Sequence, residues 1–302
     1  MNAQWAVLFA VVVSATLAEG PALAQATGHD VAAKPDFSGI WWHPSLPGIE
    51  PLDSGPTSLR NLSRRNGVGT YNQLVGDYKN PILQPWAAEV VKKNGELSKA
   101  RIGFSNPANQ CWPMPIPFIY KNFGLHLIPQ AHQITMLYEK DHEVRRVRMN
   151  AAHPAELKPS WYGDSVGHYE NDTLVIDTIG MKVGPFAMMD LYGTPQTEKL
   201  HVIERFRLIE YEEAKEGLAR DARENQPAQT YLIDRNYRGK YLQNRFTVED
   251  PNVFTTPWTA TVTYGRGSDH WPELVCAENR GEYYHGEQSK ESEVPTATKF
   301  DF

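Results

Sequence analysis

The sequence predicts a mainly β protein whose strands run antiparallel in chain order and close into an up-and-down barrel. Three observations support this class. From Leu125 onward, apolar and polar residues alternate with a period of two, which is typical of half-buried strands. Most connections between these segments are short, so consecutive strands are expected to be neighbours. Closure of such a meander removes the exposed edges of the sheet.

The N-terminus has the pattern of a secretory signal peptide over residues 1–24. Ala6 to Val13 form an apolar run that is far shorter than the ~20 residues of a membrane-spanning helix. Ala22-Leu23-Ala24 follows, which is the small-residue pattern of a cleavage site. We therefore expect an exported protein, periplasmic or secreted, that begins at Gln25 and has no membrane insertion after signal cleavage.

The composition and motifs of the chain exclude several classes of partner and cofactor. A net charge of -6 argues against nucleic acid and against anionic membranes, because both attract a basic surface. The two cysteines, Cys111 and Cys276, lie far apart in the chain and predict one disulfide in an exported protein. The sequence contains no recognisable zinc-ligand set, phosphate loop, flavin signature or nicotinamide signature, so we predict no cofactor and no metal.

Residues 25–284 are expected to form one barrel domain. A short aromatic strand over 35–44 precedes an irregular segment rich in Pro, Gly and Ser. Residues 80–124 contain a helix that begins at Pro85, followed by a proline-rich loop. A charged helical insertion covers 211–228, and its charges are expected to form a solvated face. A polar tail covers 285–302.

The strands of the barrel follow from the alternation. Residues 133–139 and 143–150 form one hairpin around a Lys-Asp-His turn, and 165–170 and 173–180 form a tighter one around Asn171-Asp172. The same pattern predicts further strands over 200–210, 241–250, 257–267 and 273–279.

Gly163 to Gly167 match G-x-S-x-G, which presents the nucleophile in many serine hydrolases. A nucleophile elbow requires a helix directly after the serine, whereas the residues after Ser165 alternate, turn and alternate again. Ser165 is therefore expected on a packing face. A serine hydrolase remains the third and weakest functional alternative.

A two-residue loop at Asn171-Asp172 places His168 and Asp177 on the opposite face of this hairpin. They are diagonal neighbours, ~7–8 Å apart at the backbone. A histidine beside a carboxylate can act as a general base. The alternative is an exposed charge pair on an ordinary outward face.

Glu204 lies on an apolar row of its strand, between Val202 and Phe206. A carboxylate there is desolvated unless it is paired, which raises its pKa and suits it to proton transfer. His201 begins the same strand and is a further catalytic candidate. The alternative to a catalytic role is an ion pair between Glu204 and an arginine of another strand: Arg145, Arg146 or Arg148.

Isolated polar residues recur on other inward rows, as in ligand cavities with apolar walls and few polar anchors. A barrel of about eight strands has room for one small ligand. The candidate ligand-binding residues are Trp41, Phe206, Asn244, Trp258, Tyr264 and Glu278.

Several motifs carry a resemblance to known families. Gly39-Ile40-Trp41 resembles the G-x-W that opens lipocalin (calycin) barrels. PDFSGIW, WYGDSVGHYENDTLVIDTIG, LHVIERFR and DPNVFTTPWT resemble a large family of exported, functionally uncharacterised bacterial proteins, over roughly Pro35 to Glu278. The resemblance implies export and a β-rich body, and it brings no reaction with it. His168 and Asn171 depart from the family pattern, which has an aromatic residue and a glycine there.

Two functional hypotheses follow. The first is an exported barrel that binds an apolar or aromatic small molecule in its central cavity. The second is a cofactor-independent lyase, hydratase or isomerase whose acid–base groups are Glu204 or the pair His168 and Asp177. The sequence does not predict the oligomeric state.

Overall fold

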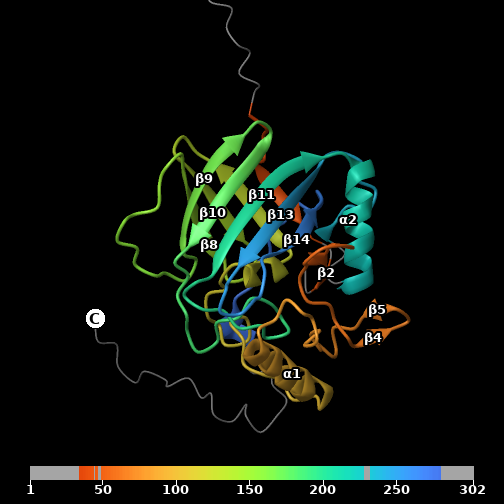
Figure 1. Ribbon diagram of the computed structural model, residues 1–302. Helices are drawn as coiled ribbons and strands as arrows, with labels where there is room; N and C mark the ends of the chain where they lie inside the picture. Colours follow the sequence, from red (N-terminus) through yellow and green to blue (C-terminus); the bar gives the residue numbers. More distant parts are fainter. Residues whose placement is uncertain (1–33, 44, 47–48, 228–231, 280–302) are drawn as a thin grey trace, which may run out of the picture. The chain divides into compact units, whose positions relative to one another are not determined.

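A curled sheet of ten strands forms a half-barrel in the computed structural model (Figure 1). The structure describes residues 34–279 apart from 44, 47–48 and 228–231. The predicted signal peptide and the polar tail therefore lie outside the described residues. Strand order in the sheet is β1-β6-β7-β8-β9-β10-β11-β13-β14-β3. The prediction of a mainly β fold is confirmed.

The sheet contains β1 (Gly39–Trp42), β3 (Glu50–Pro51), β6 (Gly124–Pro129), β7 (Gln133–Tyr138), β8 (Val144–Met149), β9 (Asp164–Glu170), β10 (Thr173–Ile179), β11 (His201–Ile209), β13 (Tyr241–Glu249) and β14 (Trp258–Tyr264). Two small ribbons pair β2 (Ser45–Leu46) with β12 (Gln226–Pro227), and β4 (Arg64–Arg65) with β5 (Val68–Gly69).

Both predicted hairpins are present, and the one around Asn171-Asp172 has the expected register. Val175 lies opposite His168, and Asp177 lies opposite Val166. Asn171 has a φ of 55°, a left-handed conformation that asparagine tolerates better than most residues. The turn between β7 and β8 uses the same conformation at Asp141 and His142.

The prediction of an entirely antiparallel, up-and-down barrel is wrong at one pair of strands. β8 and β9 run parallel, with Val147 opposite Ser165. Parallel neighbours need a crossover of about a dozen residues or more, because a tight turn reverses the chain. Residues 150–163 provide that crossover. The sheet is thus mixed, and it curls into a half-barrel.

Backbone contacts join β1 to the residues that follow β14. Trp42 and Gly265 exchange two backbone hydrogen bonds, each 2.9 Å long. The guanidinium of Arg266 lies 3.4 Å from the centre of the Trp41 ring and donates a hydrogen bond to the carbonyl of Ile40. These contacts hold the first strand against the far end of the sheet.

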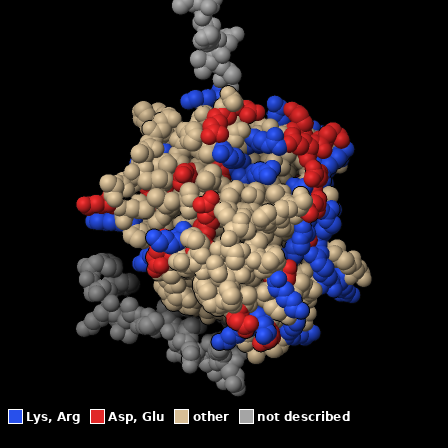
Figure 2. Space-filling model, viewed as in Figure 1, with Lys and Arg blue, Asp and Glu red and all other residues tan. Residues whose placement is uncertain are grey.

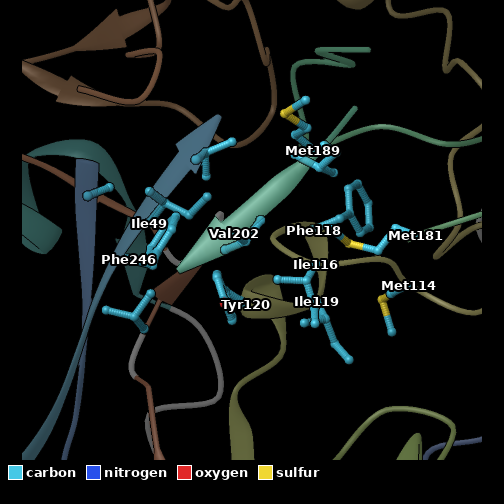
Figure 3. Close-up of a cluster of buried hydrophobic side chains, with 14 of the residues drawn as sticks. Ile49, Met114, Ile116, Phe118, Ile119, Tyr120, Met181, Met189, Val202 and Phe246 are labelled. Atoms are coloured by element: carbon cyan, nitrogen blue, oxygen red, sulfur yellow. The ribbon is translucent and has the colours of Figure 1, made fainter. Parts of the chain in front are cut away.

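The inward face of the sheet builds the core. Residues directly opposite each other on neighbouring strands point to the same side. One such row contains Ile176, Glu204, Phe246 and Ala260, all of them buried. Side chains of the segment 114–120, which overlaps the 3₁₀ helix η1 (Phe118–Lys121), pack onto this face (Figure 3).

Helix α1 (Pro85–Lys99) begins at a proline, as expected. Its buried residues are Ala87, Val91 and Gly95. Trp86, in the first turn, is 46% exposed. Its indole N–H donates to the carbonyl of Asn252, at 2.7 Å, while the ring stays in contact with water.

Helix α2 (Tyr211–Glu224) confirms that the predicted charged segment is helical. Charged side chains gather along the side of the molecule that carries α2 and the β4–β5 ribbon (Figure 2). The expectation of a wholly solvated charged face is nevertheless wrong, since Arg220, Asp221 and Glu224 are buried on the side that packs against the sheet.

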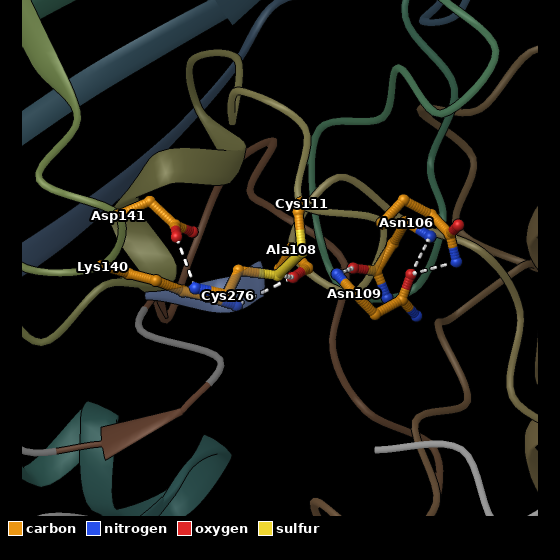
Figure 4. The surroundings of a disulfide bond; sticks show 8 residues. Asn106, Ala108, Asn109, Cys111, Lys140, Asp141 and Cys276 are labelled. Carbon is orange, nitrogen blue, oxygen red and sulfur yellow. Dashed lines mark hydrogen bonds between the residues drawn. A yellow bond between two sulfur atoms is a disulfide. The ribbon is translucent and has the colours of Figure 1, made fainter. Parts of the chain in front are cut away.

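The predicted strand over 273–279 is absent. Its last residues form the 3₁₀ helix η3 (Cys276–Asn279), and Leu274 makes only an isolated bridge. The predicted disulfide between Cys111 and Cys276 is confirmed, with the two Cα atoms 5.4 Å apart (Figure 4). The Cys276 N–H donates to Asp141 at 2.6 Å. The disulfide and this hydrogen bond fix residues 273–279 in place of the hydrogen bonds that a strand would make. Among the described residues, no helix combines the length and the apolar character needed to cross a membrane.

Candidate functional site

Glu204 forms a buried ion pair with Arg145 on the inward face of the sheet. Nη1 of Arg145 donates to Oε1 of Glu204 at 2.9 Å, and Nη2 donates to Oε2 at 2.5 Å. The two side chains are 0% and 1% exposed, respectively. Of the two alternatives for Glu204, the structure therefore shows the ion pair. The arginine partner comes from β8, on the far side of the parallel β8–β9 pair.

Ser165 belongs to the same network. The Nε of Arg145 donates to the Ser165 hydroxyl at 3.1 Å, and Nη2 donates to the Thr178 hydroxyl at 2.7 Å. The two hydroxyl oxygens lie 3.0 Å apart. The backbone after Ser165 continues as strand β9, so the helix that a nucleophile elbow requires is absent there. Ser165 is a buried hydrogen-bonding group on a packing face, as predicted.

Two buried tyrosines face this ion pair. Burial raises the pKa of Tyr120 well above its usual range, and the negative charge of Glu204 raises it further. Burial also raises the pKa of Tyr138, although the charge of Arg145 opposes that shift. Both hydroxyls are therefore neutral at physiological pH. They add hydrogen-bonding groups, without adding charge, to the inward face.

Asn244 is a further polar side chain of this face. It is 0% exposed, and neither its amide nitrogen nor its amide oxygen has a hydrogen-bond partner among the described residues. It lies opposite Phe206 on β11 and opposite Val262 on β14. The indole nitrogen of Trp258, on β14, is likewise buried without a partner in the described part of the chain.

The other predicted ligand-binding residues divide into two groups. Trp41, Phe206, Trp258 and Tyr264 are buried in the same hydrophobic core. Glu278 lies in η3 and not on a strand, so the interpretation that it stands on an inward row is wrong. The reason is the missing strand over 273–279.

A second cluster crosses the outward face of the sheet. His153 lies 2.6 Å from Asp164 through Nδ1 and 3.3 Å from Asp177 through Nε2. His201 Nε2 lies 2.9 Å from the same Asp177 oxygen. Arg148 donates to Asp164 at 2.8 Å. We call His153, Asp164, Asp177 and His201 the outer row; all four side chains are partly exposed.

Contacts within the outer row change the pKa values of Asp177 and His201. Hydrogen bonding to His201, and to a lesser extent the charge of that residue, lowers the pKa of Asp177 below its usual range. The hydrogen bond to Asp177 raises the pKa of His201, while burial opposes the shift. His201 is therefore a readily protonated imidazole beside an ionised carboxylate. Such a pair can accept and return a proton near neutral pH.

His168 does not pair with Asp177, contrary to the sequence-based hypothesis. Its Nε2 lies 3.1 Å from Glu170, two residues along the same strand, and both side chains are largely exposed. Glu170 also accepts a hydrogen bond from Arg205 at 3.0 Å. Asp177 contacts His201 because His201 is its diagonal neighbour on β11. His153 reaches Asp177 from the crossover 150–163.

Two titratable residues of interest were not proposed as site residues from the sequence. His153 comes from the crossover 150–163, for which period-two patterning predicts no position. Glu143 is buried and accepts a hydrogen bond from the Met114 N–H at 2.8 Å. Burial raises the pKa of Glu143 to about 8, despite the opposing hydrogen bonds from Met114 and Tyr162. Glu143 is the first residue of the predicted strand 143–150, and the charged sequence of that strand did not indicate its burial.

A polar hollow of about 550 Å³ opens on the surface beside the C-terminal end of α1. None of the predicted site residues lines it. Its lining residues are Thr70, Asn72, Gln73, Ser98, Arg101, Ile102 and Gly103.

Comparisons of the chain with models of known protein families, with curated proteins and with solved structures find no match. The resemblance to exported bacterial proteins therefore stays a prediction, and the candidate sites are judged on their geometry alone.

Proposed function

We propose that the protein is exported and binds a small apolar or aromatic molecule on the inward face of its half-barrel. The observation that carries this proposal is the buried amide of Asn244, which has no hydrogen-bond partner within the described residues. A buried polar group without a hydrogen bond costs about 1–3 kcal/mol, so such groups are retained where they contact something else. The disulfide between Cys111 and Cys276 supports export, because such bonds persist in oxidising compartments.

The surroundings of Asn244 favour an apolar or aromatic ligand with at least one polar atom. Phe206 lies directly opposite on β11, and the rings of Phe246 and Trp258 contact each other with centroids 5.9 Å apart. The amide and the Trp258 indole N–H would provide hydrogen bonds. Few polar groups among aromatic walls are typical of small-molecule sites.

Access to this face depends on the segment 114–120. Its side chains are fully buried against the inward face, and the Tyr120 ring lies 4.7 Å from that of Phe246. We therefore expect the ligand to bind when this segment shifts. Association should be slower than the typical protein-association range of about 10⁵–10⁷ M⁻¹s⁻¹, because a conformational change precedes it.

The test is a thermal-shift and native mass-spectrometry screen with terpenoids, phenolics and fatty acids. A compound that binds only the folded state raises the apparent stability. Asn244→Leu should weaken binding of any hit by about tenfold or more, the loss expected for one or two hydrogen bonds. Arg245→Ala is the matched control, because Arg245 is the next residue on β13 and is exposed. Unchanged affinity in the Asn244 variant, or no hit in the panel, would refute the proposal.

The outer row favours a second candidate function, cofactor-independent acid–base catalysis by a lyase, hydratase or isomerase. The specific observation is the 2.9 Å contact between His201 and Asp177, together with the opposite shifts of their pKa values. In a screen with unsaturated substrates, His201→Gln should lower kcat by about 10²-fold or more. His168→Gln is the control, because His168 lies outside the row. Equal activity of both variants would remove this candidate.

A further inference from the structure

Three buried residues from separate parts of the chain meet between helix α2 and the sheet. His43 follows β1, Glu50 begins β3, and Asp221 lies in the last turns of α2. All three are buried. Their ligand atoms, one imidazole nitrogen and two carboxylate oxygens, lie within 4.8 Å of one another. None of these residues belongs to the ion pair of Arg145 or to the outer row.

The separations fit ligands that share an ion better than direct hydrogen bonds. Nε2 of His43 lies 3.4 Å from Oδ1 of Asp221 and 3.7 Å from Oε1 of Glu50. Hydrogen bonds between nitrogen and oxygen are typically about 2.7–3.2 Å long. Two ligands that each lie about 2.1 Å from a tetrahedral ion are about 3.4 Å apart.

The charge balance also favours a cation. Two carboxylates face one imidazole, so the cluster has a net negative charge even when His43 is protonated. Among the described residues, Arg220 is one further charged side chain nearby: its Nη2 lies 3.4 Å from the Thr261 hydroxyl. Arg220 is already paired with Glu216, at 2.6 Å, and this pair adds no net charge. Buried charges are usually paired or bind a metal.

Neighbouring groups orient both carboxylates. Glu50 accepts hydrogen bonds from the Thr261 hydroxyl at 2.8 Å and from the N–H and hydroxyl of Thr263 at 2.7 and 3.0 Å. The Asn225 amide donates to Asp221 at 2.5 Å. Outer contacts of this kind orient metal ligands in proteins.

A glycine in α2 allows the helix to approach the sheet closely enough for Asp221 to lie near Glu50 and His43. Gly217 precedes Asp221 by one turn on the same face of α2. A Cβ atom at Gly217 would lie 2.5 Å from the Thr263 hydroxyl and 2.9 Å from Glu50 Oε2. A side chain there would push α2 away from the sheet, and Asp221 would move with it.

We propose that His43, Glu50 and Asp221 bind one divalent transition-metal ion such as Zn²⁺. Imidazole nitrogen with two carboxylate oxygens suits zinc and its neighbours better than calcium or magnesium, which take oxygen ligands. Bound there, the ion connects α2 to the strands at the start of the sheet. It acts as a structural staple for the helical insertion, independently of any ligand on the inward face.

The test uses the disulfide-intact protein after metal removal with a chelator. Zinc is titrated by calorimetry, and cobalt is titrated as a spectroscopic probe of coordination. We expect one ion per chain with a Kd below about 10 µM. Asp221→Asn, which preserves the shape of the side chain, should weaken binding by about 100-fold or more.

Two controls separate ligand loss from other causes. Glu224→Gln changes another buried carboxylate of α2, which is paired with Arg60 and Arg64, and should leave zinc affinity within threefold of the wild type. The double variant His153→Ala with His201→Ala removes the imidazoles of the outer row and should also keep one site. Absence of stoichiometric binding to the folded wild type overturns the proposal, as does loss of binding only in the outer-row variant.

Discussion

Replacement of Glu204 by glutamine tests whether the ion pair with Arg145 is a structural element of the core. The variant keeps the shape of the side chain and removes its charge. The guanidinium of Arg145 then stays buried, 1% exposed, without a counter-charge. Removing one partner of a buried ion pair typically destabilises a protein by about 3–5 kcal/mol. We expect Glu204→Gln to fall in this range.

The double variant Arg145→Met with Glu204→Leu should cost less than the two single changes together. Removing both charges eliminates the desolvation penalty of each. The remaining cost comes from Ser165 and Thr178, whose hydroxyls lose a donor, at roughly 1 kcal/mol each. The coupling energy from the double-mutant cycle should therefore reach at least about 2 kcal/mol.

Urea unfolding followed by tryptophan fluorescence, with the disulfide intact, measures these differences. Arg146→Met is the matched control, because Arg146 is the next residue of β8 and is exposed; its effect should stay within about 0.5 kcal/mol. If Glu204→Gln costs less than about 1 kcal/mol, or if the two single changes are additive, the pair is not the core element described above.

Three further predictions concern the disulfide and the titratable groups. Replacing Cys111 and Cys276 by serine should lower the free energy of unfolding by up to about 5 kcal/mol in urea titrations, because the bond closes a loop over a sequence separation of 165. The pKa of Glu143 is about 8 in the folded state and near 4.5 in the unfolded state. As the pH rises from 4.5 to 8, the free energy of unfolding of the wild type should therefore fall by a few kcal/mol relative to that of Glu143→Gln, which urea titrations across this range measure. The raised pKa of His201 stabilises the fold fully below about pH 6.5, and this contribution is lost as the pH rises through the folded value; His201→Gln should therefore be more destabilising at pH 6 than at pH 9, measured by thermal unfolding. An inverted pH trend in either variant would contradict the corresponding assignment.

Local patterns predicted the hairpins and the inward rows. The register around Asn171 follows from a two-residue loop, and the alternation then assigns every side chain of β9 and β10 to a face. The burial of Glu204 follows in the same way from its neighbours Val202 and Phe206. These features depend only on residues close together in sequence.

Apart from the disulfide, which the cysteine count and the expected export predicted, features that depend on distant segments could not be predicted. The parallel pairing of β8 with β9 arises from the crossover 150–163, and it places Arg145 rather than another arginine next to Glu204. The predicted strand over 273–279 fails because a disulfide and a carboxylate outside the strand pattern hold that segment. His43 and Asp221 meet only because α2 folds back onto the sheet, and no spacing in the sequence indicates that approach.

The backbone contact between Trp42 and Gly265 can form only after most of the chain has been synthesised. The first strand has one partner, β6, in the middle of the chain, and its other backbone contacts lie just beyond the last long strand. A nascent chain that lacks residues 258–266 therefore leaves the Trp41 ring without its cover from Arg266. Contacts between such distant segments slow folding, because a large loop must close before they form. The native state should accordingly be reached only after synthesis has passed this segment, and C-terminal truncation before it should yield a chain that is readily cleaved by proteases.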